Sequence, residues 1–259
     1  MKRALKILSL MLFGLILSLN LQAQSIFEKV KKTVEQHTNT DSSTSNQSNS
    51  NSKSAVENLS TTDVSGALKQ ALNIGVEEGI KKLGTEDGFY KNSLVKILLP
   101  EKLQKVESTL RMMGMGSLAD EGIKLLNRAA EDAVTEGVPI FANAITSMTF
   151  DDAKKILLGT DTAATSYLKG KTSTQLYQAF EPKVENSLGK VGADKVWNQI
   201  ITKYNSITKQ NVTPDLNQYV TEETLSGVFK MVAEKEKGVR DNAAFRSTSL
   251  LKKVFGALD

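Results

Sequence analysis

Three aspartates of this sequence are candidates for acid–base chemistry. Asp87 falls in a stretch without clear helical periodicity, and Asp151 and Asp161 fall at expected helix starts. Converging carboxylates could act as general acid and base in a hydrolase or lyase, or hold a hard cation through oxygen. A structural interpretation competes, because an aspartate at a helix start usually caps it. For Asp161 we favour capping, so that its replacement by alanine should cost about 0.5–2 kcal/mol.

Five other polar residues could bind a ligand beside these carboxylates. They are Tyr90, Thr162, Thr165, Tyr167 and Arg246. Each also has a structural interpretation as a cap, a small packing residue or a partly buried side chain, and we favour that interpretation.

The residue types of the sequence give little reason to expect a metal or cofactor site. The chain has no cysteine and one histidine, His37, which excludes disulfides, thiolate metal sites and two-histidine metal sites. Lys169–Thr172 looks like the end of a phosphate-binding loop, but Thr165 stands where that loop needs glycine. Met112–Met115 could form an adaptable binding lip, although core packing beside a glycine is the simpler expectation. We expect no metal and no cofactor.

The charge of the chain gives no reason to expect nucleic-acid binding. The formal net charge is +4, but Lys2, Arg3 and Lys6 supply most of it. The remaining basic residues are spread evenly among a nearly equal number of acidic ones. A nucleic-acid site would instead gather basic side chains on one face.

The N-terminal part of the chain predicts export. Residues 1–23 combine a basic start, an apolar stretch too short to span a bilayer and a small residue before the expected cut. The protein would be periplasmic if the host has an outer membrane, not lipid-anchored, and without a membrane span after cleavage. Residues 24–37 predict a short amphipathic helix that docks on the domain or touches a partner. Residues 38–54 contain no apolar side chain and predict a disordered linker.

Residues 55–259 show helical spacing of apolar residues almost throughout, which predicts one all-α, bundle-like domain. The exception is an irregular insertion at about residues 85–99. Gly75 and Gly79, one turn apart, predict that another backbone packs close. The expected helix boundaries are a start at Ser60, stops at Gly84, Gly159 and Gly170, a break or kink at Pro182, and N-terminal caps at Thr149, at Thr172 or Ser173, and at Thr221.

Several stretches of this domain resemble one family of exported bacterial proteins, the domain of unknown function 4197. They are Gly84–Tyr90, Val95–Pro100, Asn127–Ala130, Met148–Lys154, Gly159–Leu168 and Leu250–Gly256. The resemblance covers roughly Val56 to Gly256 and implies an all-helical, envelope-exported domain of unassigned activity. It supplies no catalytic residue, and it does not reach the N-terminal segments.

Three functions remain open at this point. The first is a non-catalytic binding or interaction module of the cell envelope. The second is an envelope hydrolase or lyase that uses carboxylates and tyrosine. The third is a carrier of an apolar ligand between helices. A packed core with an apolar surface patch would favour the first, a convergent acidic cleft the second, and a large closed apolar cavity the third.

Overall fold

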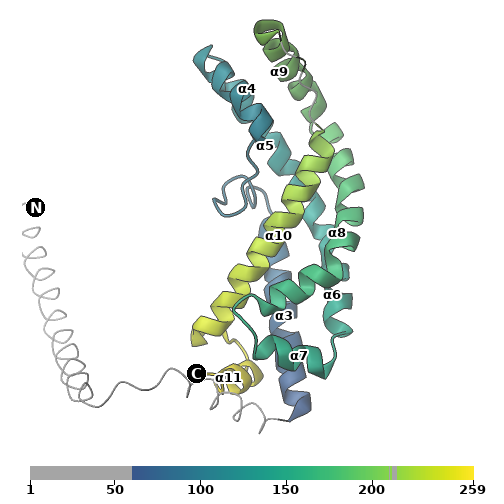
Figure 1. Cartoon of the computed structure of the whole chain (residues 1–259), viewed down its shortest axis with the longest axis vertical. Coiled ribbons are helices and arrows are strands. Elements are labelled where there is room, and N and C mark those ends of the chain that lie inside the picture. The colour runs from purple at the N-terminus through teal and green to yellow at the C-terminus, as the bar shows by residue number, and fades with distance from the viewer. Residues whose placement is uncertain (1–59, 210, 212–214) are drawn as a thin grey trace, which may run out of the picture. The chain divides into compact units, whose positions relative to one another are not determined.

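The computed structural model describes residues 60–259 except 210 and 212–214, and it leaves the side chain of Lys102 undescribed. The predicted signal (1–23), amphipathic helix (24–37) and linker (38–54) therefore lie outside the described residues. Within the described part, helices account for almost all regular structure and no strand occurs (Figure 1). The prediction of an all-α domain is confirmed.

Helix α3 (Thr61–Leu83) forms where the sequence places its boundaries. The Ser60 side chain accepts a hydrogen bond from the Asp63 amide at 3.0 Å, and Gly84 follows the last turn. The two glycines of α3 admit helix α10 (Leu216–Asp241) at close range. A Cβ on Gly75 would lie 3.4 Å from the Lys235 Cβ, and one on Gly79 would lie 3.0 Å from the Met231 side chain. The predicted close approach is confirmed.

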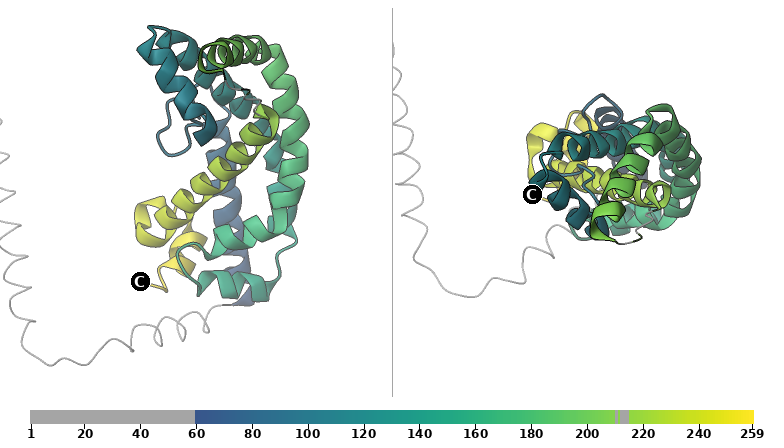
Figure 2. Two further views of the ribbon diagram at one scale, coloured as in Figure 1. Left: turned by 45° about the horizontal axis from the view of Figure 1, so that its top comes forward. Right: turned by 90° about the horizontal axis from the view of Figure 1, so that it is seen from above.

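Helix α8 (Ala163–Lys190) is longer than the sequence suggested. Gly170 does not stop it, Thr172 does not cap a new helix, and Pro182 lies inside it without ending it. Thr172 instead donates to the Leu168 carbonyl one turn back, as a helix-interior threonine can. Tertiary packing overrides the local signals, because α8 is buried against α10, α5 and α6 along its length (Figure 2).

The start of α10 also differs from the prediction. Asp215 caps the helix by accepting from the Gln218 amide at 3.0 Å, so Thr221 lies buried in the second turn and caps nothing. The prediction placed the start too late because Thr221 followed by two glutamates resembles a capping box, although Leu216, Tyr219 and Val220 already follow helical spacing.

The remaining helices pack around this frame. Helix α5 contacts α4, α8, α9 and α10, while α6, α7 and α11 contact α3. Their bounds are α4 Glu101–Met112, α5 Gly116–Ala133, α6 Gly137–Thr146, α7 Phe150–Leu157, α9 Ala193–Thr208 and α11 Ser249–Phe255, with short 3-10 turns η1 (Val134–Glu136) and η2 (Ala243–Phe245).

The segment between α3 and α4 is irregular, as predicted. It is nevertheless part of the core, because Phe89, Val95, Ile97 and Leu99 are buried in it. Burying a loop leaves its backbone amides and carbonyls without water, so they require partners inside the protein. Side chains of α5 and α10 supply those partners.

Candidate functional site

The three candidate aspartates lie in different surroundings and do not share a cleft. Asp87 belongs to the irregular segment beside α5, whereas Asp151 and Asp161 are exposed near the two ends of α7. Figure 1 shows the irregular segment and α7 well separated along α3. The arrangement brings no two of these carboxylates together for acid–base chemistry.

Asp87 is fixed in ion pairs. Its carboxylate lies 2.6 Å from an Arg128 guanidinium nitrogen and 2.7 Å from the Lys91 ammonium. Hydrogen bonds from Lys91 and then from Arg128 hold the pKa of the Asp87 carboxyl below its usual value. A carboxyl held in its ionised form is a poor general acid.

A polar cluster on α5 holds the irregular segment in place. Glu131 accepts hydrogen bonds from the amides of Phe89 at 3.0 Å and Tyr90 at 3.1 Å. The side chain of the buried Asn127 accepts from the Ile97 amide at 2.9 Å and donates to the Ile97 carbonyl at 2.8 Å. This pair of hydrogen bonds replaces the pair that a neighbouring β-strand would make. These side chains satisfy buried backbone groups, so the cluster is structural.

Tyr90 packs within this cluster under two cations. The Lys96 ammonium lies 4.5 Å from its ring centre and the Arg128 guanidinium 5.9 Å. Both distances suit attraction between a cation and the face of an aromatic ring. The ring is thereby covered by the protein's own charges.

The corner between α7 and α8 shows why the expectation for Asp161 was wrong. Thr162 occupies the N-cap position of α8 without a side-chain hydrogen bond, and Asp161 is exposed. The cap comes from α10, where Glu236 accepts from the amides of Ala164 at 2.9 Å and Thr165 at 2.8 Å. Rules for local capping cannot find a carboxylate that is distant in sequence.

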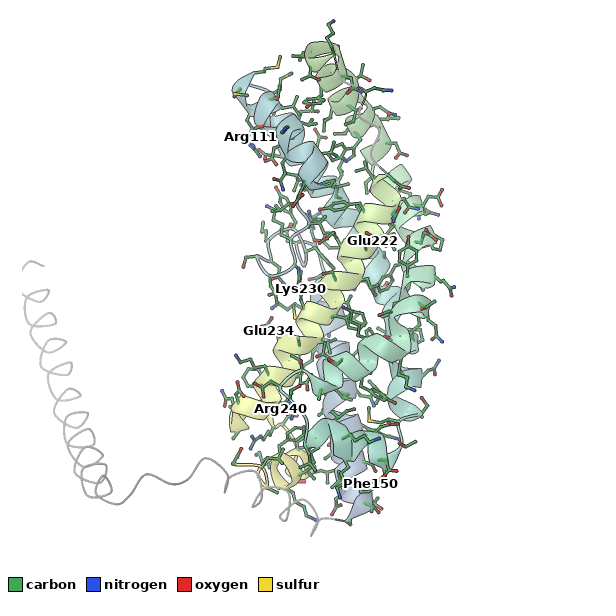
Figure 3. All side chains as sticks on the ribbon, viewed as in Figure 1. Arg111, Phe150, Glu222, Lys230, Glu234 and Arg240 are labelled. Atoms are coloured by element: carbon green, nitrogen blue, oxygen red, sulfur yellow. The ribbon has the colours of Figure 1, made fainter. Side chains whose placement is uncertain are left out.

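Arg240 completes this buried network. Its guanidinium lies 2.9 Å from Glu236 and donates to the carbonyls of Ile156 at 2.8 Å and Leu157 at 3.2 Å. One arginine therefore joins the end of α7 to the carboxylate that caps α8. Figure 3 labels Arg240 at the lower part of α10.

Two further binding candidates also have structural partners. Arg246 is buried and donates to the carbonyls of Val239 and Arg240 at 3.1 and 2.8 Å, and it pairs with Asp259 at 2.6 Å. Burial, and then the nearby Asp152 carboxylate, raise the pKa of the Tyr167 phenol. A phenol with a raised pKa stays protonated near neutrality and is unsuited to act as a base.

An open groove with a largely apolar lining lies between α3, α10, η2 and α11. It has a volume of about 290 Å³, and its apolar lining includes Ile74, Val239, Phe245 and Leu251. Phe245 is 51% exposed, a large fraction for a phenylalanine. Sequence reasoning missed this groove, because its walls come from helices far apart in the chain.

A second, deeper cavity adjoins the groove. The two share Ala71, Gly75, Lys235 and Val239, and the deeper one continues past them to Glu236. Its volume is about 30 Å³, which is the space of a water molecule and not of a drug-sized ligand. The groove, and not the cavity, is large enough to receive an apolar group.

The described part of the chain lacks two further kinds of feature. Among its residues, no group of three or more histidine, cysteine, aspartate or glutamate side chains could hold a metal ion. None of its helices combines the length and apolar character that crossing a bilayer requires.

Comparison with known proteins gives one result. No curated protein and no solved structure matches the chain. A family model described as protein of unknown function DUF4197 matches residues 58–256, which is most of the chain and nearly all of the domain described above. The chain therefore belongs to the DUF4197 family of proteins of unknown function.

Proposed function

We propose that this chain is an exported cell-envelope protein that acts as a non-catalytic interaction module and binds a partner protein in the groove between α3, α10 and α11. The observation that carries the proposal is the exposed Phe245 beside an apolar floor. Aromatic residues are enriched at the centres of protein interfaces, where they contribute much of the binding energy.

The rim of the groove suits a protein segment of mixed polarity. Lys235 and Glu78 form an ion pair of 2.8 Å across α10 and α3, and both line the groove. A partner that inserts an apolar side chain could exchange hydrogen bonds with this pair at the edge. An apolar centre with a polar rim is the usual composition of such interfaces.

The two alternative functions fit the geometry less well. A carrier would enclose most of its ligand, whereas the groove is open and the cavity beneath it holds about 30 Å³. A hydrolase would need Asp87, Asp151 and Asp161 in one cleft, and they lie apart (Figure 1).

Site-specific photo-crosslinking in host cells tests the groove. A photoreactive phenylalanine analogue at Phe245 should give a defined adduct with a protein. Adding Ile74→Glu, which places a charge in the groove lining, should abolish that adduct. The matched control places the analogue at Leu94, an apolar side chain that is 43% exposed in the irregular segment.

The outcomes separate the proposals. Equal adducts from positions 245 and 94, or an adduct that survives Ile74→Glu, would exclude the groove as the binding site. An adduct with a small apolar molecule would instead support the carrier. Export is tested separately, since the mature chain recovered from the envelope should begin at Gln24.

A further inference from the structure

The Phe245 ring lies against α10 by one face. A Cβ on Gly238 would lie 3.1, 3.2 and 3.4 Å from three consecutive ring carbons of Phe245, Cδ1, Cε1 and Cγ. Nearly equal distances to neighbouring ring atoms place the Gly238 backbone over the face of the ring and not at its edge. Because that face is covered and the side chain is still 51% exposed, the opposite face is open to solvent.

The groove beside the ring has room for one large side chain. Its volume of about 290 Å³ lies at the lower limit of ligand pockets, which enclose about 300–1,000 Å³. Along α3 the lining extends from Ala71 to Glu78, which is two helical turns or about 10 Å. The occupant is therefore a single side chain, or a pair of them, presented by a partner surface and not a long peptide.

Phe245 is itself a candidate for that side chain. Within the described residues it is the only aromatic side chain that is exposed and not partly buried. Met112 and Met113 are 81% and 45% exposed, so the expectation that they fill the core is wrong, but neither lines the groove. The Phe245 ring cannot fill its own groove, because it forms a wall of that groove and rests on Gly238. The ring of a second copy has no such restriction.

An apolar ring beside an apolar hollow makes this surface complementary to itself. If two copies meet about a two-fold axis at this surface, the ring of each covers the groove of the other. Such an interface buries the same patch on both chains, and two-fold dimers are the commonest soluble oligomers.

The charges at the rim suit the same arrangement. Lys235 and Glu78 lie 2.8 Å apart, and their side chains are 25% and 60% exposed. A rim with one charge of each sign favours neither a strongly acidic nor a strongly basic partner. About a two-fold axis the order of the two charges is reversed in the facing copy, so each Lys235 can approach the Glu78 of the other chain.

We propose that the partner in the groove is a second copy of this chain, with the Phe245 ring of each copy covering the groove of the other. The inference rests on the proposed function and names its partner. A contact centred on one side chain belongs to the small interfaces, which are weak or transient. The dimer should therefore form and dissociate with the protein concentration.

Sedimentation equilibrium of the purified full chain measures this dimer. The weight-average mass should rise from that of one chain towards twice that value as the concentration increases. Phe245→Ser, which removes the ring at a position that is already half-exposed, should keep the mass of one chain. The matched control is Leu98→Ser, which removes an apolar side chain that is 56% exposed in the irregular segment and should leave the dimer unchanged.

Exchange of the rim charges tests the contact in a second way. Glu78→Lys places two lysines at the rim of each copy, and Lys235→Glu places two glutamates there. Either variant alone should stay monomeric, because like charges would face each other across the interface. An equimolar mixture should dimerise at least about tenfold more tightly than either variant, since unlike charges then meet. Both variants lose the pair within the chain, so a gain on mixing reports a contact between copies.

A single-chain mass at every concentration, a Phe245→Ser variant that still dimerises, or a mixture that associates no more tightly than its components would each overturn the inference. The photo-crosslink at Phe245 separates it from the proposed function. An adduct of twice the chain mass is expected. An adduct with a different protein would overturn the inference and keep the groove as a binding site, whereas the lack of any protein adduct would refute the proposed function itself.

Discussion

Replacing Glu236 by glutamine should destabilise the domain more than its modest change in shape suggests. Both carboxylate oxygens face donors only. One accepts from the Ala164 amide and Arg240, and the other accepts from the amide and hydroxyl of Thr165 at 2.8 Å each. Glutamine replaces one oxygen by an amino group, so in either orientation a donor would face a donor.

The magnitude follows from burial. The side chains of Glu236 and Arg240 are 5% and 10% exposed, so solvent screens their attraction little. Removing one member of a buried ion pair costs about 3–5 kcal/mol, because the other charge is left uncompensated. The carbonyls of Ile156 and Leu157 still accept from Arg240, which places the expected loss near the lower limit, about 3 kcal/mol.

Urea unfolding followed by circular dichroism measures this loss. The midpoint should fall while the slope stays constant, since the surface exposed on unfolding is unchanged. Glu234→Gln is the matched control, because Glu234 lies two residues away on α10 and is exposed (Figure 3). Its effect should stay within about 0.5 kcal/mol. A Glu236→Gln variant as stable as this control would refute the assignment of Glu236 as the cap of α8.

Two further predictions concern the candidate aspartates. Asp161→Ala should change the free energy of unfolding by less than about 0.5 kcal/mol, since Asp161 caps nothing. Thr149→Ala should cost about 0.5–2 kcal/mol, because Thr149 caps α7. If Asp161→Ala lost more stability than Thr149→Ala, both cap assignments would be contradicted. For Asp87, a folded pKa below the unfolded value of about 3.9 means that its stabilisation is present above that pH and is lost below it. The stability deficit of Asp87→Asn at neutral pH should therefore shrink as unfolding is measured below about pH 4, and a deficit independent of pH would exclude a charge effect.

Local features of the sequence were sufficient to predict the fold class and several helix boundaries. Ser60 and Gly84 bound α3, and Thr149 forms a capping box with Asp152, because a cap acts within three residues of its helix. The irregular insertion was also visible, since its apolar residues follow no helical period. Each of these features depends on neighbours in sequence.

Contacts between distant segments were not predictable in the same way. Pro182 and Gly170 oppose a helix locally, but the burial of α8 against α5 and α10 outweighs that preference. The groove at Phe245 and the capping of α8 by Glu236 likewise need the fold to be assembled first. The sequence did hold one usable signal for these contacts. Asn127 and Glu236 are polar residues on otherwise apolar helix faces, and both are buried in the fold.

The stretches that carry the family resemblance explain why it supplied no functional site. Asn127 holds the irregular segment, Thr149 caps α7, and Thr165 receives the carboxylate that caps α8. Those positions satisfy buried polar groups, and any chain that keeps this fold must satisfy them in some way. Phe245 lies outside the same stretches and is 51% exposed, although nothing in the fold requires an apolar side chain there. These stretches therefore report the scaffold, and a binding role is to be sought in the groove beside Phe245, where an apolar surface stays open to solvent.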